Sequence, residues 1–212
     1  MNTLLITNDW KPKTGGISTY LRSLVENLDH KFFIYGPSWI EGDDVYPSAD
    51  TFIINPRKVF EDIQKIVNDN QIDIILHGSS NPNFLFVNKI NTLDVPNSPK
   101  NVKIPQYMIC HGAEFNVLNY IPIVRNLLSR NLDNLNTIFT VSEFSRKKLV
   151  DITDTEIINI GAGIEIPNYE NNYENNVPLT IGVVSRLVSR KKISWLIDVA
   201  HDLKEEGLPI EL

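Results

Sequence analysis

The sequence predicts an α/β protein built on a doubly wound parallel sheet, and two patterns support this prediction. Short apolar runs rich in β-branched and aromatic residues alternate with stretches of helical periodicity through the first 160 residues. Strands that alternate with helices form parallel sheets, because each helical crossover returns the chain to the same edge of the sheet. A further strand and helix pattern after residue 178 indicates the start of a second domain of the same kind.

The individual elements follow from their length and their apolar spacing. Seven short apolar runs are predicted to be buried strands, at 3–7, 31–36, 50–55, 72–78, 104–112, 136–142 and 155–160. Four stretches have apolar residues at helical spacing and are predicted to be helices, at 17–29, 57–69, about 118–131 and 143–151. In the first of these helices, Leu21, Leu24, Val25 and Leu28 share one face.

The chain is expected to have two domains of unequal size. Residues 1–165 form the first domain, and the polar, Asn-rich segment 166–178, which contains "PNYENNYENNVP", is predicted to be a linker. Residues 179–212 contain a strand, a helix and the opening of another strand. So short a unit cannot bury its own apolar faces. We therefore expect it to be the first βα unit of an incomplete second domain.

Composition excludes several classes of protein. The net charge of −6 and the pI near 5.2 argue against general nucleic-acid binding, because no overall positive field attracts a phosphate backbone. A single cysteine, Cys110, cannot form an internal disulfide, and the start "MNTLLITNDW" lacks the features of a signal peptide. No apolar run is long enough to span a bilayer. These features predict a cytoplasmic protein.

Two glycines follow the first predicted strand in "NDWKPKTGGISTYL". Gly15 and Gly16 would let backbone N–H groups approach a ligand closely, and the N-terminus of the following helix favours an anion. The segment is neither a dinucleotide fingerprint nor a Walker loop. Taken alone, the pair is equally consistent with a plain turn.

Polar residues follow two other predicted strands. His111 comes directly after the strand in "YMICHGAEF", at the edge where open α/β sheets bind ligands. Taken alone, the residue favours a structural histidine over a functional one. In "FTVSEFSRKKLV", Ser142 is suited to cap the next helix and Glu143 to lie in its first turn. No pattern supports a metal site, and Asp43 and Asp44 are expected in a solvated turn.

A basic segment, "VVSRLVSRKK", occupies residues 183–192 near the end of this acidic chain. It follows a predicted strand and precedes a helix, so its cations are expected at the ligand-binding edge of the second domain. Guanidinium and ammonium groups there suit phosphate oxygens, and the alternative is a solvated basic turn. The cations are Arg186, Arg190, Lys191 and Lys192.

Five segments in this order and spacing resemble the retaining glycosyltransferases of the GT4 type, which have the GT-B fold. They are Gly15-Gly16, "HGAEF", "VSEFSRKKL", "IGAGIEIP" and "VVSRLVSRKK" before "ISWLIDVA". The resemblance implies two Rossmann-like domains that face each other, the first holding mainly the acceptor and the second the nucleotide-sugar donor. This sequence has Ser185 and Lys192 where the family often has glycine, and Gly161-Ala162 where it commonly has Pro-Asn.

The resemblance also implies roles for individual residues. Arg186 and Lys191 match the cations that bind the donor diphosphate. Arg190, Lys192 and Glu143 are secondary candidates for site residues. Gly15 and Gly16 match the loop that faces the donor phosphates, and His111 matches a histidine near the transferred sugar. The implied reaction is metal-independent sugar transfer, with retention, from a nucleoside diphosphate donor to a glycan or lipid-linked acceptor. No resident cofactor is implied.

Because the family's acidic motif would lie beyond residue 212, the chain by itself is expected to have little or no activity. Two alternatives from other classes stay open: a sugar-binding or partner-binding module without catalysis, and a nucleotide-sugar epimerase. A weaker hypothesis is peripheral contact with an anionic membrane through "YIPIVRNLLSRNL", which carries Arg125 and Arg130. The donor sugar, the base, the acceptor and the oligomeric state do not follow from the sequence.

Overall fold

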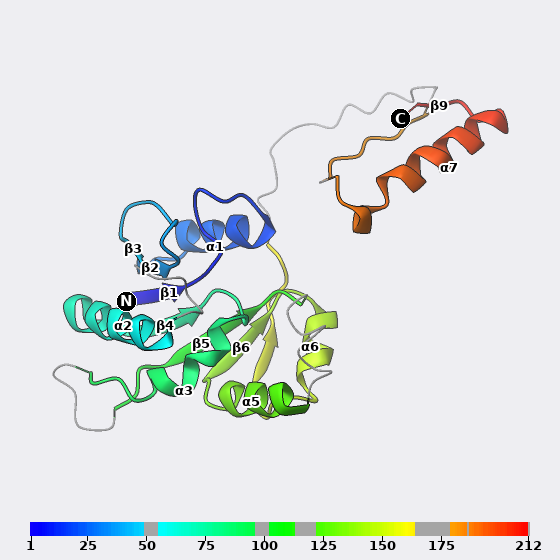
Figure 1. Cartoon of the computed structure of the whole chain (residues 1–212). Helices are drawn as coiled ribbons and strands as arrows, with labels where there is room; N and C mark the ends of the chain where they lie inside the picture. Colours follow the sequence, from blue (N-terminus) through cyan, green and yellow to red (C-terminus); the bar gives the residue numbers. More distant parts are fainter. Residues whose placement is uncertain (49–54, 96–101, 113–121, 164–178, 186, 212) are drawn as a thin grey trace. The chain divides into compact units, whose positions relative to one another are not determined.

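The computed structural model describes residues 1–48, 55–95, 102–112, 122–163, 179–185 and 187–211. The chain divides into two compact units, Met1–Ile164 and Glu165–Leu212. The predicted linker, 166–178, lies outside the described residues. The two units are described separately below (Figure 1).

The first unit is built on a seven-stranded sheet in the order β3-β2-β1-β4-β5-β6-β7, and all neighbouring strands are parallel. This arrangement confirms the predicted doubly wound, Rossmann-like sheet. Because the strands are parallel, their carboxyl ends meet at one edge, where ligands bind in such folds. The strands are β1 (Asn2–Ile6), β2 (Lys31–Gly36), β3 (Val45–Pro47), β4 (Ile74–His77), β5 (Gln106–Cys110), β6 (Thr137–Thr140) and β7 (Ile157–Asn159).

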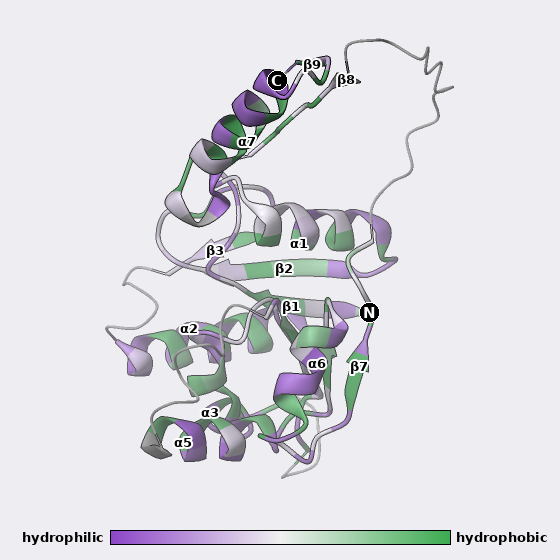
Figure 2. Ribbon diagram, turned by 90° about the vertical axis from the view of Figure 1, so that its right-hand side faces the viewer, coloured by the Kyte–Doolittle hydropathy of each residue, from purple (hydrophilic) through white to green (hydrophobic). Residues whose placement is uncertain are grey.

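Helices cover both faces of this sheet, and alternation along each strand divides the core between them. From β1, Leu5 packs on one side with Leu21, whereas Leu4 and Ile6 pack on the other side with residues such as Val59. Figure 2 shows α1 on one side of β1 and β2, and α2, α3 and α5 on the other. The helices are α1 (Gly16–Asn27), α2 (Pro56–Asn70), α3 (Val87–Ile90), α5 (Pro122–Leu132) and α6 (Glu143–Leu149), with a 3₁₀ turn, η1, at Asn83–Leu85.

The structure differs from the predicted elements in two places. β3 was missed because it is a three-residue edge strand with half-exposed side chains, in a segment interpreted as a solvated turn. α3 was also missed, since four residues are too few to show helical periodicity. Of the strand predicted at 50–55, only Asn55 is described, and it caps α2. The predicted helix start at 118–121 also lies outside the described residues.

The second unit has a short parallel pair, β8 (Leu179–Thr180) and β9 (Ile210–Glu211), and a helix, α7 (Ile193–Glu205). Of the strand expected from Leu179 onward, only its first two residues pair with β9. Within α7 only Ala200 is buried, and Trp195 is 64% exposed. Most side chains of α7 are therefore exposed or half-buried in this unit, and the assignment of residues 179–212 to an incomplete second domain stays a prediction.

Candidate functional site

The glycine loop connects β1 to α1 at the carboxyl edge of the sheet. Neighbouring segments hold it on two sides: the backbone N–H of Glu41 donates to the carbonyl of Lys11 (3.1 Å), and the Nζ of Lys13 lies 3.6 Å from the centre of the Trp39 ring. The hydroxyl of Ser18 donates to the carbonyl of Lys13 (3.0 Å). The loop is therefore fixed by its flanks, while a Cβ added at Gly15 or Gly16 would meet no atom within 4 Å.

The N-terminus of α1 differs from those of α2 and α6. Asn55 caps α2 with its side-chain oxygen, and Ser142 caps α6. No described side chain caps α1, whose N-cap is Gly15, and its first turn has no acidic residue. Uncapped N–H groups and the helix dipole together favour a bound anion. The structure therefore shows an N-terminus suited to a phosphate directly behind the two glycines.

His111 follows β5 at the same edge and is oriented by two contacts. Its Nε2 lies 3.0 Å from the carbonyl oxygen of Gly78, which only accepts, so Nε2 must carry a proton. Its ring forms a T-shaped contact with the Tyr20 ring from α1, with centroids 5.5 Å apart and planes at 83°. Tyr20 thus links α1 to His111. Sequence patterns do not reveal this contact, because it joins residues 91 positions apart.

Burial raises the pKa of Tyr20 above its usual value near 10, so its phenol is neutral at physiological pH. A neutral phenol is not a base at this pH, so the contact of its ring with the imidazole is one of packing. We conclude that Tyr20 positions His111 sterically.

Gly112, which follows His111, lies close to Ser145 of α6. Gly112 has φ +90°, and a Cβ at this position would collide with the hydroxyl oxygen of Ser145. The side chain of Ser142 accepts from the backbone N–H of Ser145 (3.2 Å), which is the predicted helix cap. Only glycine combines this positive φ with so close an approach of α6.

Glu143 is exposed and forms an ion pair with Arg146, with Oε1 and Nη2 2.9 Å apart. Hydrogen bonding to Arg146, together with the nearby positive charges of Arg146 and Lys147, lowers the pKa of its carboxyl. The carboxylate is therefore engaged within its own helix and contacts neither Gly15, Gly16 nor His111.

A buried polar cluster that the sequence did not predict lies beneath this edge. Gln106 donates from its amide nitrogen to the carbonyl of Val87 (3.1 Å) and to Oδ1 of Asn91 (2.8 Å), so its oxygen must accept from Nε2 of His77 (2.9 Å). The other ring nitrogen, Nδ1, has no hydrogen-bond partner among the described residues. Burial lowers the pKa of His77 to about 4, so the ring is neutral.

The basic segment of the second unit is only partly described. Arg186 lies outside the described residues, and Arg190 is described in its backbone alone, within the 3₁₀ turn η2 (Ser189–Lys191). Lys191 and Lys192 are exposed, and the Nζ of Lys192 lies 5.6 Å from the centre of the Trp195 ring. The roles assigned to these four residues therefore stay predictions.

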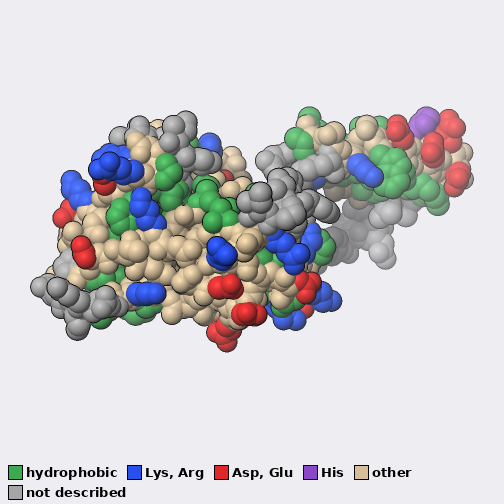
Figure 3. Space-filling view, turned by 60° about the horizontal axis from the view of Figure 1, so that its bottom comes forward, with side chains coloured by type: hydrophobic (Ala, Val, Ile, Leu, Met, Phe, Trp, Pro, Cys, Tyr) green, Lys and Arg blue, Asp and Glu red, His purple; other side chains and the backbone are tan. Residues whose placement is uncertain are grey.

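Other sequence hypotheses have the following counterparts. Asp43 and Asp44 are exposed beside β3, and no group of three or more His, Cys, Asp or Glu side chains in the described part of the chain could hold a metal ion. None of the described helices is long and apolar enough to cross a membrane. In α5, Arg125 donates to the carbonyl of Asp151 (2.9 Å), and Leu128 and Leu132 are buried. On the face in Figure 3, acidic and basic side chains are interspersed over the first unit.

Comparison with known proteins gives distant relatives. No protein-family model matches the chain. The GDP-mannose-dependent alpha-(1-6)-phosphatidylinositol monomannoside mannosyltransferase of Mycobacterium tuberculosis is 23% identical over 161 residues, which are 68% of this chain and 39% of that enzyme. The enzyme of the same name from Mycolicibacterium smegmatis is 25% identical over 92 residues, 37% of this chain and 24% of its own length.

The chain thus spans about two fifths of the length of the Mycobacterium tuberculosis relative. Among solved structures, a sucrose-phosphate synthase from Thermosynechococcus elongatus aligns with a TM-score of 0.47 at 13% identity, covering 77% of this chain and 90% of that one. The similarity in sequence is therefore to enzymes named as sugar transferases that depend on a nucleotide-sugar.

Proposed function

We propose that the chain is part of a retaining GT4-type glycosyltransferase with the GT-B fold, and that it takes a sugar from a nucleoside diphosphate donor. GDP-mannose is the first donor to test, and a glycan or lipid-linked alcohol is the proposed acceptor. The observation that carries the proposal is the similarity to GDP-mannose-dependent transferases over 161 residues. The uncapped N-terminus of α1 behind Gly15 and Gly16, beside the edge that holds His111, supports it because it suits a diphosphate.

The proposed reaction replaces one bond at the anomeric carbon. The acceptor oxygen bonds to that carbon, the carbon–oxygen bond to the diphosphate breaks, and the diphosphate leaves with the electron pair. Attack from the face that the diphosphate leaves gives retention, and the proton of the acceptor hydroxyl passes to the departing phosphate oxygen. His111 lies near the transferred sugar in this scheme, and the backbone N–H groups of the glycine loop face the phosphates.

Negative charge grows on the departing diphosphate, so the scheme needs cations near it. We assign this role to Arg186 and Lys191, with Arg190 and Lys192 nearby. In this proposal the four cations neutralise the charge that a divalent metal ion neutralises in other diphosphate chemistry, and the enzyme needs no resident cofactor.

The test is transfer of labelled mannose from GDP-mannose by the protein at its natural length, comparing wild type with Arg186→Ala and Lys191→Ala. Loss of a cation that stabilises the departing group should lower kcat by roughly 10²-fold. Lys204→Ala is the matched control, because Lys204 is an exposed lysine of α7. Near-normal rates in both test variants would contradict the assignment of the cations.

The same samples separate the two alternative functions. Binding of GDP-mannose without transfer would indicate a binding module, and conversion of the donor into another GDP-sugar would indicate an epimerase. For a lipid-linked acceptor, we further propose that the protein acts at a cytoplasmic membrane surface through the region of Arg125 and Arg130. Flotation with vesicles of phosphatidylglycerol and phosphatidylcholine tests this, and absence of the protein from the lipid fraction would contradict it.

A further inference from the structure

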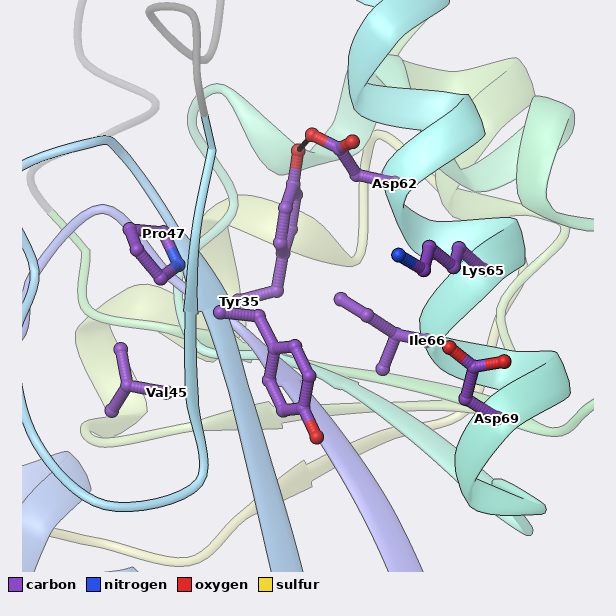
Figure 4. A pocket seen from close by; sticks show the side chains of 8 residues that line it. Tyr35, Val45, Pro47, Asp62, Lys65, Ile66 and Asp69 are labelled. Carbon is purple, nitrogen blue, oxygen red and sulfur yellow. Dashed lines mark hydrogen bonds between the residues drawn. The ribbon is translucent and has the colours of Figure 1, made fainter.

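A pocket lies between α2 and the edge strands β2 and β3. Its volume is about 320 Å³, at the small end of the roughly 300–1,000 Å³ typical of ligand clefts. The residues that matter here are Tyr35, Tyr46, Asp62, Lys65, Ile66 and Asp69. Figure 4 shows Lys65, Ile66 and Asp69 projecting from one side of α2 toward the strand segments that carry Val45 and Pro47.

This pocket is separate from the site at the carboxyl edge. Tyr35 and Ile66 belong to the core on the α2 side of the sheet. Trp10 and Leu21, from the glycine loop and α1, belong to the core on the opposite side. The sheet itself therefore lies between the pocket and α1.

The side chains of α2 pair in a regular way except at this pocket. Residues four positions apart are joined at Arg57–Glu61 (3.1 Å), Lys58–Asp62 (3.1 Å) and Gln64–Asn68 (2.9 Å). Lys65 and Asp69 have the same spacing, yet neither side chain has a hydrogen bond or an ion pair within the described ranges. Both line the pocket. The helix thus leaves one cation and one carboxylate available where the pocket is.

The other polar side chains that line the pocket already have hydrogen-bond or ion-pair partners. The hydroxyl of Tyr35 donates to Oδ2 of Asp62 (3.1 Å), and Lys58 pairs with Oδ1 of the same carboxylate. The hydroxyl of Tyr46 donates to Oδ1 of Asn70 (3.4 Å), which leaves its ring as an apolar surface beside Ile66. Among the lining residues, the carboxylate of Asp62 is already paired with Lys58 from outside the pocket. One cation, Lys65, and one carboxylate, Asp69, are thus left to face a ligand.

These features define the ligand. An exposed ion pair with a charged ligand contributes little. In contrast, the hydrogen bonds that an ammonium donates to a neutral hydroxyl, and that a carboxylate accepts from one, are strengthened by the charge. An apolar ring next to such groups suits the C–H face of a sugar. We propose that this pocket binds a neutral saccharide unit, with Asp69 accepting from its hydroxyls, Lys65 donating to them and the Tyr46 ring packed against its carbon face.

The choice of a saccharide over another neutral polyol rests on the proposed function, while the location and chemistry of the pocket do not. In a glycan-elongating enzyme, such a second site would hold a residue of the acceptor away from the reacting end. The affinity for the acceptor would then depend on Lys65 and Asp69, whereas the rate of the chemical step would not.

The experiment is a titration of the ¹⁵N-labelled chain with mannose and α-1,6-linked mannobiose, followed by amide chemical shifts. Saturable shifts are expected at Tyr46, Lys65 and Asp69. The double variant Lys65→Ala/Asp69→Ala should bind about tenfold more weakly, because it removes the charge-assisted hydrogen bonds. Lys147→Ala/Asp154→Ala, which changes an exposed lysine and an exposed aspartate near α6 and β7, should bind as wild type does.

Several outcomes would overturn the inference. They are unchanged amide shifts at the pocket with both sugars, equal affinity in the Lys65→Ala/Asp69→Ala variant, or displacement of the sugar by the zwitterion L-alanine at similar concentration. Shifts confined to the segments around Gly16 and His111 would also overturn it while supporting the proposed function. Conversely, pocket shifts in a protein that transfers no sugar would support the saccharide pocket and contradict the transferase.

Discussion

The rings of Tyr20 and His111 form a T-shaped contact, with centroids 5.5 Å apart and planes at 83°. The contact joins the second turn of α1 to the carboxyl end of β5, so the helix behind the glycine loop and the histidine of the site form one packed unit. Together with the hydrogen bond to Gly78, it fixes the imidazole plane.

We predict that Tyr20→Leu lowers kcat for transfer by several-fold to tenfold, the effect expected for loss of an aromatic pair. Tyr20→Phe should keep the wild-type rate, because the ring is retained and the neutral phenol has no chemical role. Steady-state kinetics and the ¹H–¹⁵N spectrum of the His111 ring check this. An equal loss in both variants would show that the hydroxyl is required.

Substitution of the two glycines separates a ligand-binding loop from a plain turn. Gly15 has extended backbone (φ 176°), and an added Cβ at Gly15 or Gly16 meets no atom within 4 Å. The variant Gly15→Ala/Gly16→Ala should therefore unfold in urea within about 0.5 kcal/mol of wild type. Its affinity for GDP, measured by calorimetry, should fall at least about tenfold, since the methyl groups obstruct the approach of phosphate. Unchanged GDP affinity would favour the plain turn.

Gly112→Ala should be destabilising for two physical reasons. The residue has φ +90°, and its new Cβ would collide with the hydroxyl of Ser145. We expect a loss of about 2–3 kcal/mol in the free energy of unfolding, from backbone strain and the collision together. Gly161→Ala is the control, because Gly161 also has positive φ (+69°) but no atom within 4 Å of an added Cβ. Equal losses in the two variants would show that the collision with Ser145 does not contribute to the destabilisation.

His77 predicts a pH dependence of stability. Its pKa is lowered to about 4 in the folded state from 6.5, so the unfolded chain takes up the proton first as pH falls. This contribution to stability is complete above pH 6.5 and is lost as pH falls toward 4, amounting to about 3 kcal/mol. The physical cause is the burial of the ring, which disfavours its charged form. Nδ1 would take up the proton, and it is buried without a hydrogen-bond partner among the described residues.

The check is urea unfolding of wild type and His77→Gln at several pH values between 4 and 7. The variant should lose most of the pH dependence in this range, because an amide can donate to Gln106 without titrating. His201→Gln, at a 69% exposed side chain, should retain the wild-type profile. Identical profiles for wild type and His77→Gln would contradict the assignment.

Most of the central sheet could be predicted from the sequence because its strands are buried. Runs such as Phe32–Tyr35 are apolar on both faces, which is the signal of a parallel sheet covered by helices. The edge strand β3 could not be predicted in this way, since its one neighbour and half-exposed residues leave no such run.

The site shows the same division. Gly15, Gly16 and His111 could be proposed from the sequence because the glycines lie between β1 and α1 and His111 directly follows β5. Position after a strand is a local signal. Tyr20 and His77 could not, because their environment is made by residues 91 and 29 positions away. Lys65 and Asp69 have the spacing of an ordinary helical ion pair, and only the structure shows that they do not form one.

Transfer of sugar from a nucleoside diphosphate donor by this protein can be measured as incorporation of a labelled sugar into an acceptor. The protein at its natural length should be incubated with a membrane lipid extract in three parallel reactions. Each reaction contains one labelled sugar source: GDP-mannose, UDP-glucose or free mannose. We expect label from the nucleotide-sugar to be incorporated into lipid or glycan. Label from free mannose should not be incorporated. Binding of GDP-mannose with no transfer to any acceptor fraction would contradict it.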